Sequence, residues 1–134
     1  MAKIKYKGGY KYQLAETVCV QTHIVDYTVE TEYIQLDKNG LLTVRHGYCW
    51  DGATWFPDLK SIMRGSLFHD ALYQLMRLKL ISIDERKNAD EMLEMLCVED
   101  GMSVFVAASV YRAVRMFAAD AAKPKNAKTI EVAP

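Results

Sequence analysis

Four side chains in the middle of the chain have the types and spacing that acid–base or metal chemistry requires. His69 and Asp70 are adjacent, Tyr73 follows one helical turn after His69, and Asp90 comes later. The segment from Ile62 to Met76 is apolar on most of its circumference, which indicates a buried helix. A buried carboxylate is costly unless it is paired or bound to a metal. We therefore treat His69 and Asp70 as the candidate functional centre.

Two helices are predicted to hold this centre. The first runs from about Leu59 to Leu78, with Asp58 as its N-cap. The second begins at Ser82, because Ser82 followed three residues later by Glu85 forms a capping box. Since the link between the two helices is short, we expect them to pack as an antiparallel pair.

Asp90 on the second helix is the expected partner of His69. Reflection of positions about the turn centre places Asp90 level with Asp70 on the first helix. A histidine oriented by a carboxylate can act as a base, because the partner fixes the tautomer and stabilises the charged imidazolium. Tyr73, one turn after His69, is expected to hydrogen-bond a carboxylate in the same network.

Asp70 is expected to serve a different purpose from His69. On a helix its side chain points about 100° away from that of His69, toward the glycine-containing loop at residues 47–54. A carboxylate that faces backbone carbonyls is typical of calcium sites, because calcium takes oxygen ligands. Calcium is therefore the metal that this arrangement predicts.

The N-terminal half predicts antiparallel strands. The clearest hairpin turn is Asp37–Gly40, because its Asn39-Gly40 dipeptide is a strong turn signal. The loop at residues 47–54 follows the last predicted strand and has no sustained periodicity. The predicted strands, chosen for alternating or β-branched residues, are Lys3–Lys7, Tyr10–Leu14, Thr17–Gln21, Tyr27–Leu36 and Leu41–Arg45.

The predicted fold class is α+β, with an N-terminal antiparallel β region followed by three helices. The third helix runs from about Ser103 to Ala119, and Gly101 marks the end of the second. We expect a single domain over residues 1–121 and a loosely ordered tail over residues 122–134. The predicted inward residues of the third helix are Val104, Ala107, Ala108, Tyr111 and Val114, with Arg112 and Arg115 outward in solvent.

Composition excludes several classes of protein. Seventeen basic residues balance seventeen acidic ones, so the charge does not indicate a nucleic-acid binder. No apolar run is long enough to span a membrane, and the first residues lack the apolar core of a signal peptide. Cys19, Cys49 and Cys97 are odd in number and scattered, which favours a reducing compartment over a disulfide framework.

The loop and the helix pair together resemble a phage and prophage family. The matching elements are Gly-Tyr-x-Trp-Asp-Gly-Ala-Thr at residues 47–54, Arg-x-Ser-Leu-x-His-Asp-Ala-Leu-Tyr at residues 64–73, and Arg-x-x-Ala-Asp at residues 86–90. That family is catalogued mainly as a domain of unknown function. The resemblance implies a phage protein of the host cytoplasm or the virion, with membrane lipid or another phage protein as its partner.

The His-Asp-x-x-Tyr motif is also similar to the active site of secreted phospholipase A2, which implies ester hydrolysis. By this similarity His69 would activate a water, while Asp90 and Tyr73 would orient it. Asp70 would bind calcium. The chain departs from those enzymes in having no cysteine on the predicted helix. The loop residues that would complete the metal site are Tyr48, Trp50 and Gly52 through their backbone, with Asp51 as a further ligand.

The polar residues of the predicted site also have structural interpretations that involve no chemistry. The His69–Asp70–Asp90 network can fix helix packing or bind an ion without chemistry, as in a non-enzymatic virion or assembly protein. Asp90 can instead form an exposed ion pair with Arg86 at helical spacing. Arg64 is either an anchor for the loop at residues 47–54 or a surface residue.

The aromatic residues after the loop have two interpretations. Trp50, Trp55 and Phe56 either pin the loop onto the core, which we favour, or form an apolar rim that touches membrane or an acyl chain. Cys49 beside them is expected to be a packed cysteine and not a nucleophile.

Overall fold

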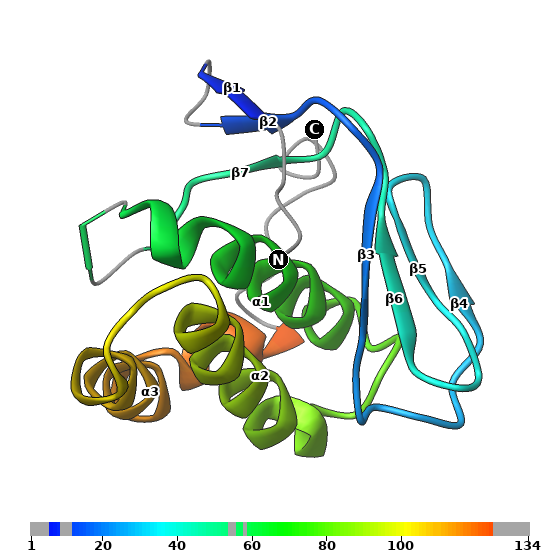
Figure 1. The fold of residues 1–134 in the computed structure, drawn as a ribbon. Coiled ribbons are helices and arrows are strands. Elements are labelled where there is room, and N and C mark those ends of the chain that lie inside the picture. Colours follow the sequence, from blue (N-terminus) through cyan, green and yellow to red (C-terminus); the bar gives the residue numbers. More distant parts are fainter. Residues whose placement is uncertain (1–5, 9–11, 54–55, 58, 125–134) are drawn as a thin grey trace. The chain divides into compact units, whose positions relative to one another are not determined.

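The computed structural model describes residues 6–8, 12–53, 56–57 and 59–124. Antiparallel strands come first and three helices follow, so the α+β class predicted from the sequence is confirmed (Figure 1). The described residues up to Asp51 form one compact unit and those from Gly52 onward form a second. We call them the β unit and the helical unit. The single domain expected over residues 1–121 stays a prediction.

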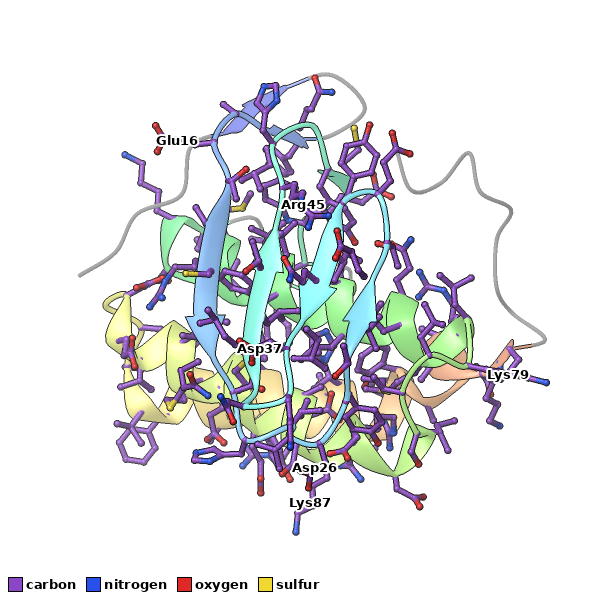
Figure 2. The ribbon with its side chains drawn as sticks, turned by 90° about the vertical axis from the view of Figure 1, so that its right-hand side faces the viewer. Glu16, Asp26, Asp37, Arg45, Lys79 and Lys87 are labelled. Atoms are coloured by element: carbon purple, nitrogen blue, oxygen red, sulfur yellow. The ribbon has the colours of Figure 1, made fainter. Side chains whose placement is uncertain are left out.

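The β unit contains two antiparallel sheets. Their inward residues alternate along the strands, as β6 illustrates, where Leu42 and Val44 are buried between partly exposed neighbours. The first sheet has the order β1-β2-β7. The second has the order β3-β6-β5-β4, and Figure 2 shows its four strands side by side. The strands are β1 (Tyr6–Gly8), β2 (Tyr12–Leu14), β3 (Val18–Gln21), β4 (Val29–Glu30), β5 (Ile34–Leu36), β6 (Leu41–Val44) and β7 (Cys49–Trp50).

The turn between β5 and β6 forms where Asn39-Gly40 predicts it. Asp37 closes this turn, since its carboxylate accepts hydrogen bonds from the backbone N–H groups of Asn39 and Leu41. Gly40 has φ +92°, and a Cβ there would lie 2.7 Å from the carbonyl oxygen of Thr22. Only glycine fits this position without strain.

Two predictions for the β unit were wrong. The single strand expected over residues 27–36 is divided into β4 and β5, because Thr31 and Ile34 exchange hydrogen bonds that close a turn. The expected loop at residues 47–54 contributes β7, in which Trp50 pairs with Tyr12. Strand pairing of this kind is set by the partner backbone and leaves no periodicity to detect in a segment this short.

The helical unit contains α1 (Lys60–Arg77), α2 (Arg86–Glu99) and α3 (Val104–Phe117), with short 3-10 helices η1 (Ile83–Glu85) and η2 (Ala119–Ala122). The bounds of α1 and α3 agree with those predicted to within two residues, whereas α2 begins at Arg86, after η1, and not at Ser82. The expected cap Asp58 lies outside the described residues. α1 packs on α2 and α2 on α3, while η2 contacts α1 and α3. In Figure 1, α3 is seen nearly end-on beside α2.

Local chemistry ends and starts these helices. The N–H of Met102 donates to the carbonyl of Cys97 around Gly101, whose φ is +106°, so glycine ends α2 as predicted. The hydroxyl of Ser103 then accepts from Val106 N–H and caps α3. Ser82 caps Asp84 N–H and begins the 3-10 turn η1, which continues into α2.

Close contact between α1 and α2 depends on Gly65. A Cβ there would lie 2.9 Å from Leu93 Cδ1 and 3.4 Å from Leu93 O. The absence of a side chain at residue 65 therefore lets the two helices approach closely, which brings the polar residues of α1 within reach of α2.

The inward face of α3 differs in part from the prediction. Ala107 and Val114 are buried as expected, and Val110 joins them, but Ala108 and Tyr111 are only partly buried and Val104 is 66% exposed. Val104 is in the first turn, at the end of α3 away from η2. Among the described residues, no helix has both the length and the hydropathy that crossing a bilayer requires.

Candidate functional site

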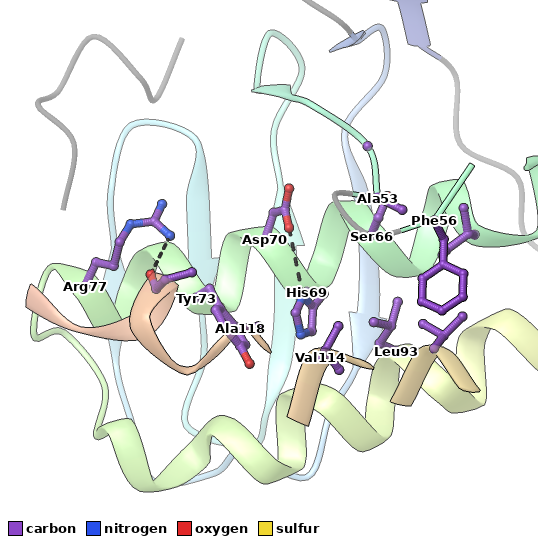
Figure 3. Close-up of a pocket in the computed structure, with 14 residues that line it drawn as sticks. Ala53, Phe56, Ser66, His69, Asp70, Tyr73, Arg77, Leu93, Val114 and Ala118 are labelled. Atoms are coloured by element: carbon purple, nitrogen blue, oxygen red, sulfur yellow. Dashed lines mark hydrogen bonds and ion pairs between the residues drawn. The ribbon is translucent and has the colours of Figure 1, made fainter. Parts of the chain in front are cut away.

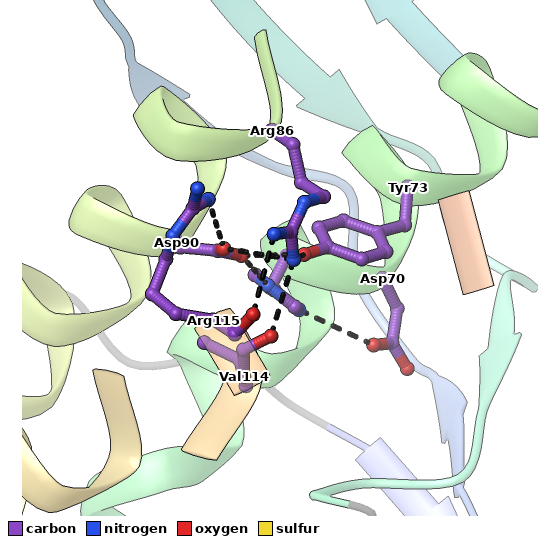
Figure 4. Close-up of polar contacts among 7 residues, drawn as sticks. Asp70, Tyr73, Arg86, Asp90, Val114 and Arg115 are labelled. Atoms are coloured by element: carbon purple, nitrogen blue, oxygen red, sulfur yellow. Dashed lines mark hydrogen bonds and ion pairs between the residues drawn. The ribbon is translucent and has the colours of Figure 1, made fainter. Parts of the chain in front are cut away.

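Asp90 is the centre of a polar network inside the helical unit (Figure 4). Its carboxylate is completely buried, and Oδ1 lies 2.7 Å from His69 Nε2 and 2.6 Å from the Tyr73 hydroxyl, which donates to it. Oδ2 accepts from Arg115 Nη1 at 2.8 Å. These contacts offset the desolvation of the buried charge. The structure thus brings together His69, Tyr73 and Asp90, three of the four side chains that sequence analysis placed at the site.

Arg86 reinforces the network from α2. Its Nη1 lies 3.5 Å from Asp90 Oδ2 and donates to the Tyr73 hydroxyl at 3.3 Å. The same guanidinium donates to the carbonyl oxygens of Val114 and Arg115 near the C-terminal end of α3, where a positive charge is favourable. The alternative of an exposed Arg86–Asp90 pair was right about the partners and wrong about the exposure, since the two side chains are 16% and 0% exposed.

Arg115 is the residue that sequence analysis missed. It was expected to point into solvent, yet its guanidinium reaches the buried Asp90 from α3. The omission arose because the crossing of α3 over α2 cannot be read from the sequence. One signal was present, since a buried carboxylate with one histidine and one tyrosine as partners still has an oxygen to satisfy.

The charges of the network hold each other in place. Burial lowers the pKa of His69, but Asp70 and Asp90 raise it more strongly, so the pKa lies above its usual value. Burial raises the pKa of Asp90, whereas His69, Tyr73 and Arg115 bring it below its usual value. Burial and the adjacent Asp90 raise the pKa of Tyr73, so its hydroxyl stays a proton donor.

His69 lines a pocket together with Asp70 (Figure 3). Nδ1 lies 3.9 Å from Asp70 Oδ1, which is beyond a direct hydrogen bond. The side chain of Asp70 is 39% exposed, whereas that of His69 is only 6% exposed. The open volume of the pocket is about 520 Å³, including solvent at its mouth. His69 is therefore anchored by Nε2, while Nδ1 is on the side of Asp70 in the lining of the pocket.

The pocket has chemically distinct ends. Phe56 and Leu93 line one end, and Arg77 lines the other beyond Tyr73. Ile62, which also lines the pocket, is in the first turn of α1, at the opposite end of that helix from Arg77. Asp70 is the one carboxylate among the described residues that line it. Its full lining is Gly52, Ala53, Phe56, Ile62, Ser66, His69, Asp70, Tyr73, Arg77, Leu93, Val110, Val114, Ala118 and Ala121.

The predicted calcium ligands fall in both units. Gly52 lines the pocket with Asp70, whereas Tyr48, Trp50 and Asp51 belong to the β unit. Within the described ranges, no group of three or more histidine, cysteine or carboxylate side chains is arranged to hold a metal. Most ligands of the predicted calcium site are backbone oxygens and not side chains, and backbone oxygens suit calcium. The calcium site stays a prediction.

Arg64 has a structural role that neither interpretation of the sequence anticipated. It is buried in α1, where its Nε lies 3.0 Å from Asp100 Oδ2 and its Nη2 lies 2.8 Å from Glu99 Oε1. These ion pairs join the first turns of α1 to the end of α2. Arg64 therefore aligns the helices that carry the network and is not a surface residue.

Residues of the loop and its aromatic neighbours are only partly within the site. Phe56 lines the pocket, Trp50 is buried in the β unit, and Trp55 lies outside the described residues. Burial raises the pKa of the Cys49 thiol, which disfavours the reactive thiolate and agrees with a packed cysteine.

No protein-family model matches the chain, and neither the curated proteins nor the solved structures contain a significant match to it. The chemistry of the site therefore has to be argued from its own residues.

Proposed function

We propose that this protein is a hydrolase that cleaves an ester with a water activated by His69. One observation carries the proposal: His69 is held at Nε2 by a buried carboxylate, while its Nδ1 is on the side of Asp70, with which it lines a pocket. A general base needs a fixed tautomer and access to the proton it removes. The Asp90 contact supports the first requirement and the pocket supports the second.

The proposed reaction uses His69 twice. In the first step Nδ1 takes a proton from water as the water oxygen attacks the ester carbonyl, giving a tetrahedral intermediate and an imidazolium. Asp90 stabilises the imidazolium, since its carboxylate lies 2.7 Å from Nε2. In the second step the carbon–oxygen bond to the alcohol breaks, and the imidazolium returns its proton to the departing oxygen. The products are a carboxylic acid and an alcohol.

Tyr73 and Arg115 act as positioning residues in this scheme. Both hold the carboxylate of Asp90, one at each oxygen, and neither needs to touch substrate. Their contacts restrict rotation of the carboxylate and thereby fix the plane of the His69 ring. Orientation of a catalytic base is costly to lose even when its chemistry is intact.

Calcium is part of the proposal as a ligand of Asp70. The fit rests on donor chemistry, because a half-exposed carboxylate and the backbone of Gly52 line the same pocket and both offer oxygen. When bound, calcium would supply a positive charge that stabilises the developing oxyanion. The protein's own residues carry the proton transfer with or without it.

Lipid is the proposed source of the ester. The pocket has an apolar end, and α3 exposes apolar side chains that a water-facing helix ordinarily lacks. Phe105 is 86% exposed and Met116 is 72% exposed. In the phage setting that the loop and helix motifs resemble, such an activity would act on host membrane during lysis or infection.

A non-enzymatic role is the alternative proposal, and two observations favour it. Every buried side-chain nitrogen and oxygen in the described part of the chain has a hydrogen-bond partner, and His69 is 5% exposed. A fully satisfied network can serve packing alone. In that case the protein would be a virion or assembly component, with another phage protein on the exposed face of α3.

Hydrolysis by wild type and His69→Ala separates the two proposals. Release of fatty acid from phospholipid vesicles by wild type, lost in the variant, supports the hydrolase. No release by wild type, under conditions where the protein is folded, supports the structural role. Thermal melting of both proteins establishes that each is folded in the assay.

A further inference from the structure

The pocket carries one cationic side chain whose charge the site does not neutralise. The guanidinium of Arg77 donates from Nη1 to the carbonyl oxygen of Ala121 at 3.0 Å. Within the described residues this is its one hydrogen bond, and no carboxylate pairs with it. Every other arginine of the network contacts Asp90. Arg77 therefore retains N–H donors and a full positive charge at the pocket wall.

The position of Arg77 is set by the same helix that carries His69. His69, Tyr73 and Arg77 follow each other at intervals of four residues, so they lie along one face of α1. His69 and Arg77 are about 12 Å apart along the helix axis at 1.5 Å per residue. The side chain of Arg77 leans toward the N-terminus of α1, hence toward His69, as long side chains on helices do.

The opposite end of the pocket is apolar. Ile62 on α1 and Leu93 on α2 line it together with Phe56, and Figure 3 shows Phe56 and Arg77 on opposite sides of His69. The carboxylate of Asp70 lies beside His69, between the ends. The sequence of surfaces along α1 is thus apolar, then the water-activating histidine with its carboxylate, then cationic.

We propose that Arg77 recognises an anionic group of the substrate, and that the substrate is an amphiphilic ester. Its acyl chain would occupy the end lined by Phe56, Ile62 and Leu93, its carbonyl would lie at His69, and a phosphate on the alcohol side would bind Arg77. Arginine suits phosphate because its planar fork presents two parallel donors. This inference rests on the proposed hydrolase, but the binding of an anionic group by Arg77 can be tested without hydrolysis.

Three probes separate the parts of the site without any reaction. Hexyl phosphate combines a chain with a phosphate, 1-hexanol has the chain alone, and inorganic phosphate has the anion alone. Binding of each to wild type is measured by calorimetry and by shifts of amide NMR signals. We expect hexyl phosphate to bind at least about tenfold more tightly than either fragment, as a charge-assisted hydrogen bond of ordinary strength would give.

Variants assign the anion contact to Arg77. Arg77→Gln removes the charge and Arg77→Lys keeps it. Arg112→Gln is the matched control, because Arg112 is an exposed arginine whose one hydrogen bond within the described ranges is to Ser109. We expect Arg77→Gln to bind hexyl phosphate no better than 1-hexanol. Arg77→Lys should restore part of the preference, and Arg112→Gln should bind as wild type does.

Each contrary result overturns a defined part of the proposal. Equal affinity of wild type for hexyl phosphate and 1-hexanol would remove the anion site, whether or not any variant folds. Equal affinity for hexyl phosphate and inorganic phosphate would identify a free-phosphate site and remove the amphiphile. Loss of the preference in Arg112→Gln would show diffuse charge attraction. Phosphate-selective binding without hydrolysis of any ester would leave the Arg77 site standing and overturn the hydrolase.

Discussion

Arg115 Nη1 lies 2.8 Å from Asp90 Oδ2, so α3 supplies a cation to the same carboxylate that holds His69 on α1. The site is consequently a three-helix structure and not a feature of the α1–α2 pair alone. Any change that loosens α3 should disturb the orientation of His69, although no residue of α3 contacts the imidazole through a hydrogen bond in the described part of the chain.

Arg115→Gln should lower the free energy of unfolding by more than the substitution of a partly exposed side chain usually does. It removes a partner of a fully buried charge, and losses of this kind cost about 3 kcal/mol when both groups are buried. Because the Arg115 side chain is 32% exposed, we expect about 1–2 kcal/mol in urea unfolding at pH 7. Arg112→Gln is the control and should cost less than about 0.5 kcal/mol. Equal stability of the two variants would contradict the network.

Stability should depend on pH with opposite signs from Asp90 and His69. The lowered pKa of Asp90 contributes stability above its unfolded value of about 3.9, and this contribution is lost as pH falls. The raised pKa of His69 contributes stability that is complete below its unfolded value of about 6.5 and is lost as pH rises through the folded value. The network is therefore most stabilising between about pH 4 and 6.5.

Urea unfolding of wild type and His69→Gln from pH 4 to pH 9 isolates the contribution of His69. His23 and His46 are present in both proteins, so their titration cancels in the difference. The free energy of unfolding of wild type should exceed that of His69→Gln by the largest amount at acidic pH. This difference should shrink as the pH rises. A difference that is constant across this range would show that His69 is not held between the two carboxylates.

Calcium should stabilise wild type through Asp70. A ligand that binds only the folded state at a hundred times its Kd adds about 2.7 kcal/mol, which raises the Tm by several degrees. Asp70→Asn should lose this shift because an amide is a weaker calcium ligand. Asp84→Asn, at an exposed acidic residue of η1, should keep it. An equal shift in all three proteins would assign calcium to another site.

The exposed apolar residues of α3 should determine membrane association. Replacing Phe105 and Met116 by serine removes two of the most exposed apolar side chains, which are 86% and 72% exposed. We expect sedimentation with phospholipid vesicles to fall severalfold, since such binding scales with apolar area. Ile83→Ser, at a half-exposed position of η1, is the matched control. Unchanged sedimentation of the double variant would separate this face from lipid.

Part of the site could be predicted because helix geometry is regular. The α+β class, the three helices and the turn at Asn39-Gly40 follow from periodicity, caps and turn residues. Reflection about the α1–α2 turn placed Asp90 near His69, and the structure has these side chains in contact. Residues on neighbouring helices joined by a short link have few alternative registers, which is why this argument worked.

The rest depended on contacts between elements that no local pattern encodes. Arg115 meets Asp90 only because α3 crosses the pair at one height, and the same crossing brings Arg86 against the end of α3. Arg64 pairs with Asp100 across the unit, and β7 forms through its antiparallel pairing with β2, where Trp50 is opposite Tyr12. The sequence alone does not distinguish an arginine in solvent from one that pairs with a buried carboxylate.

Fatty-acid release from mixed phospholipid vesicles tests the central claim most directly. Wild type and His69→Ala are compared in calcium and in chelator, with thermal melts to show that both are folded. The proposed hydrolase predicts release by wild type that falls at least about a hundredfold in the variant, as expected on loss of a general base. Absence of release by folded wild type in calcium, or equal release by the variant, would contradict it.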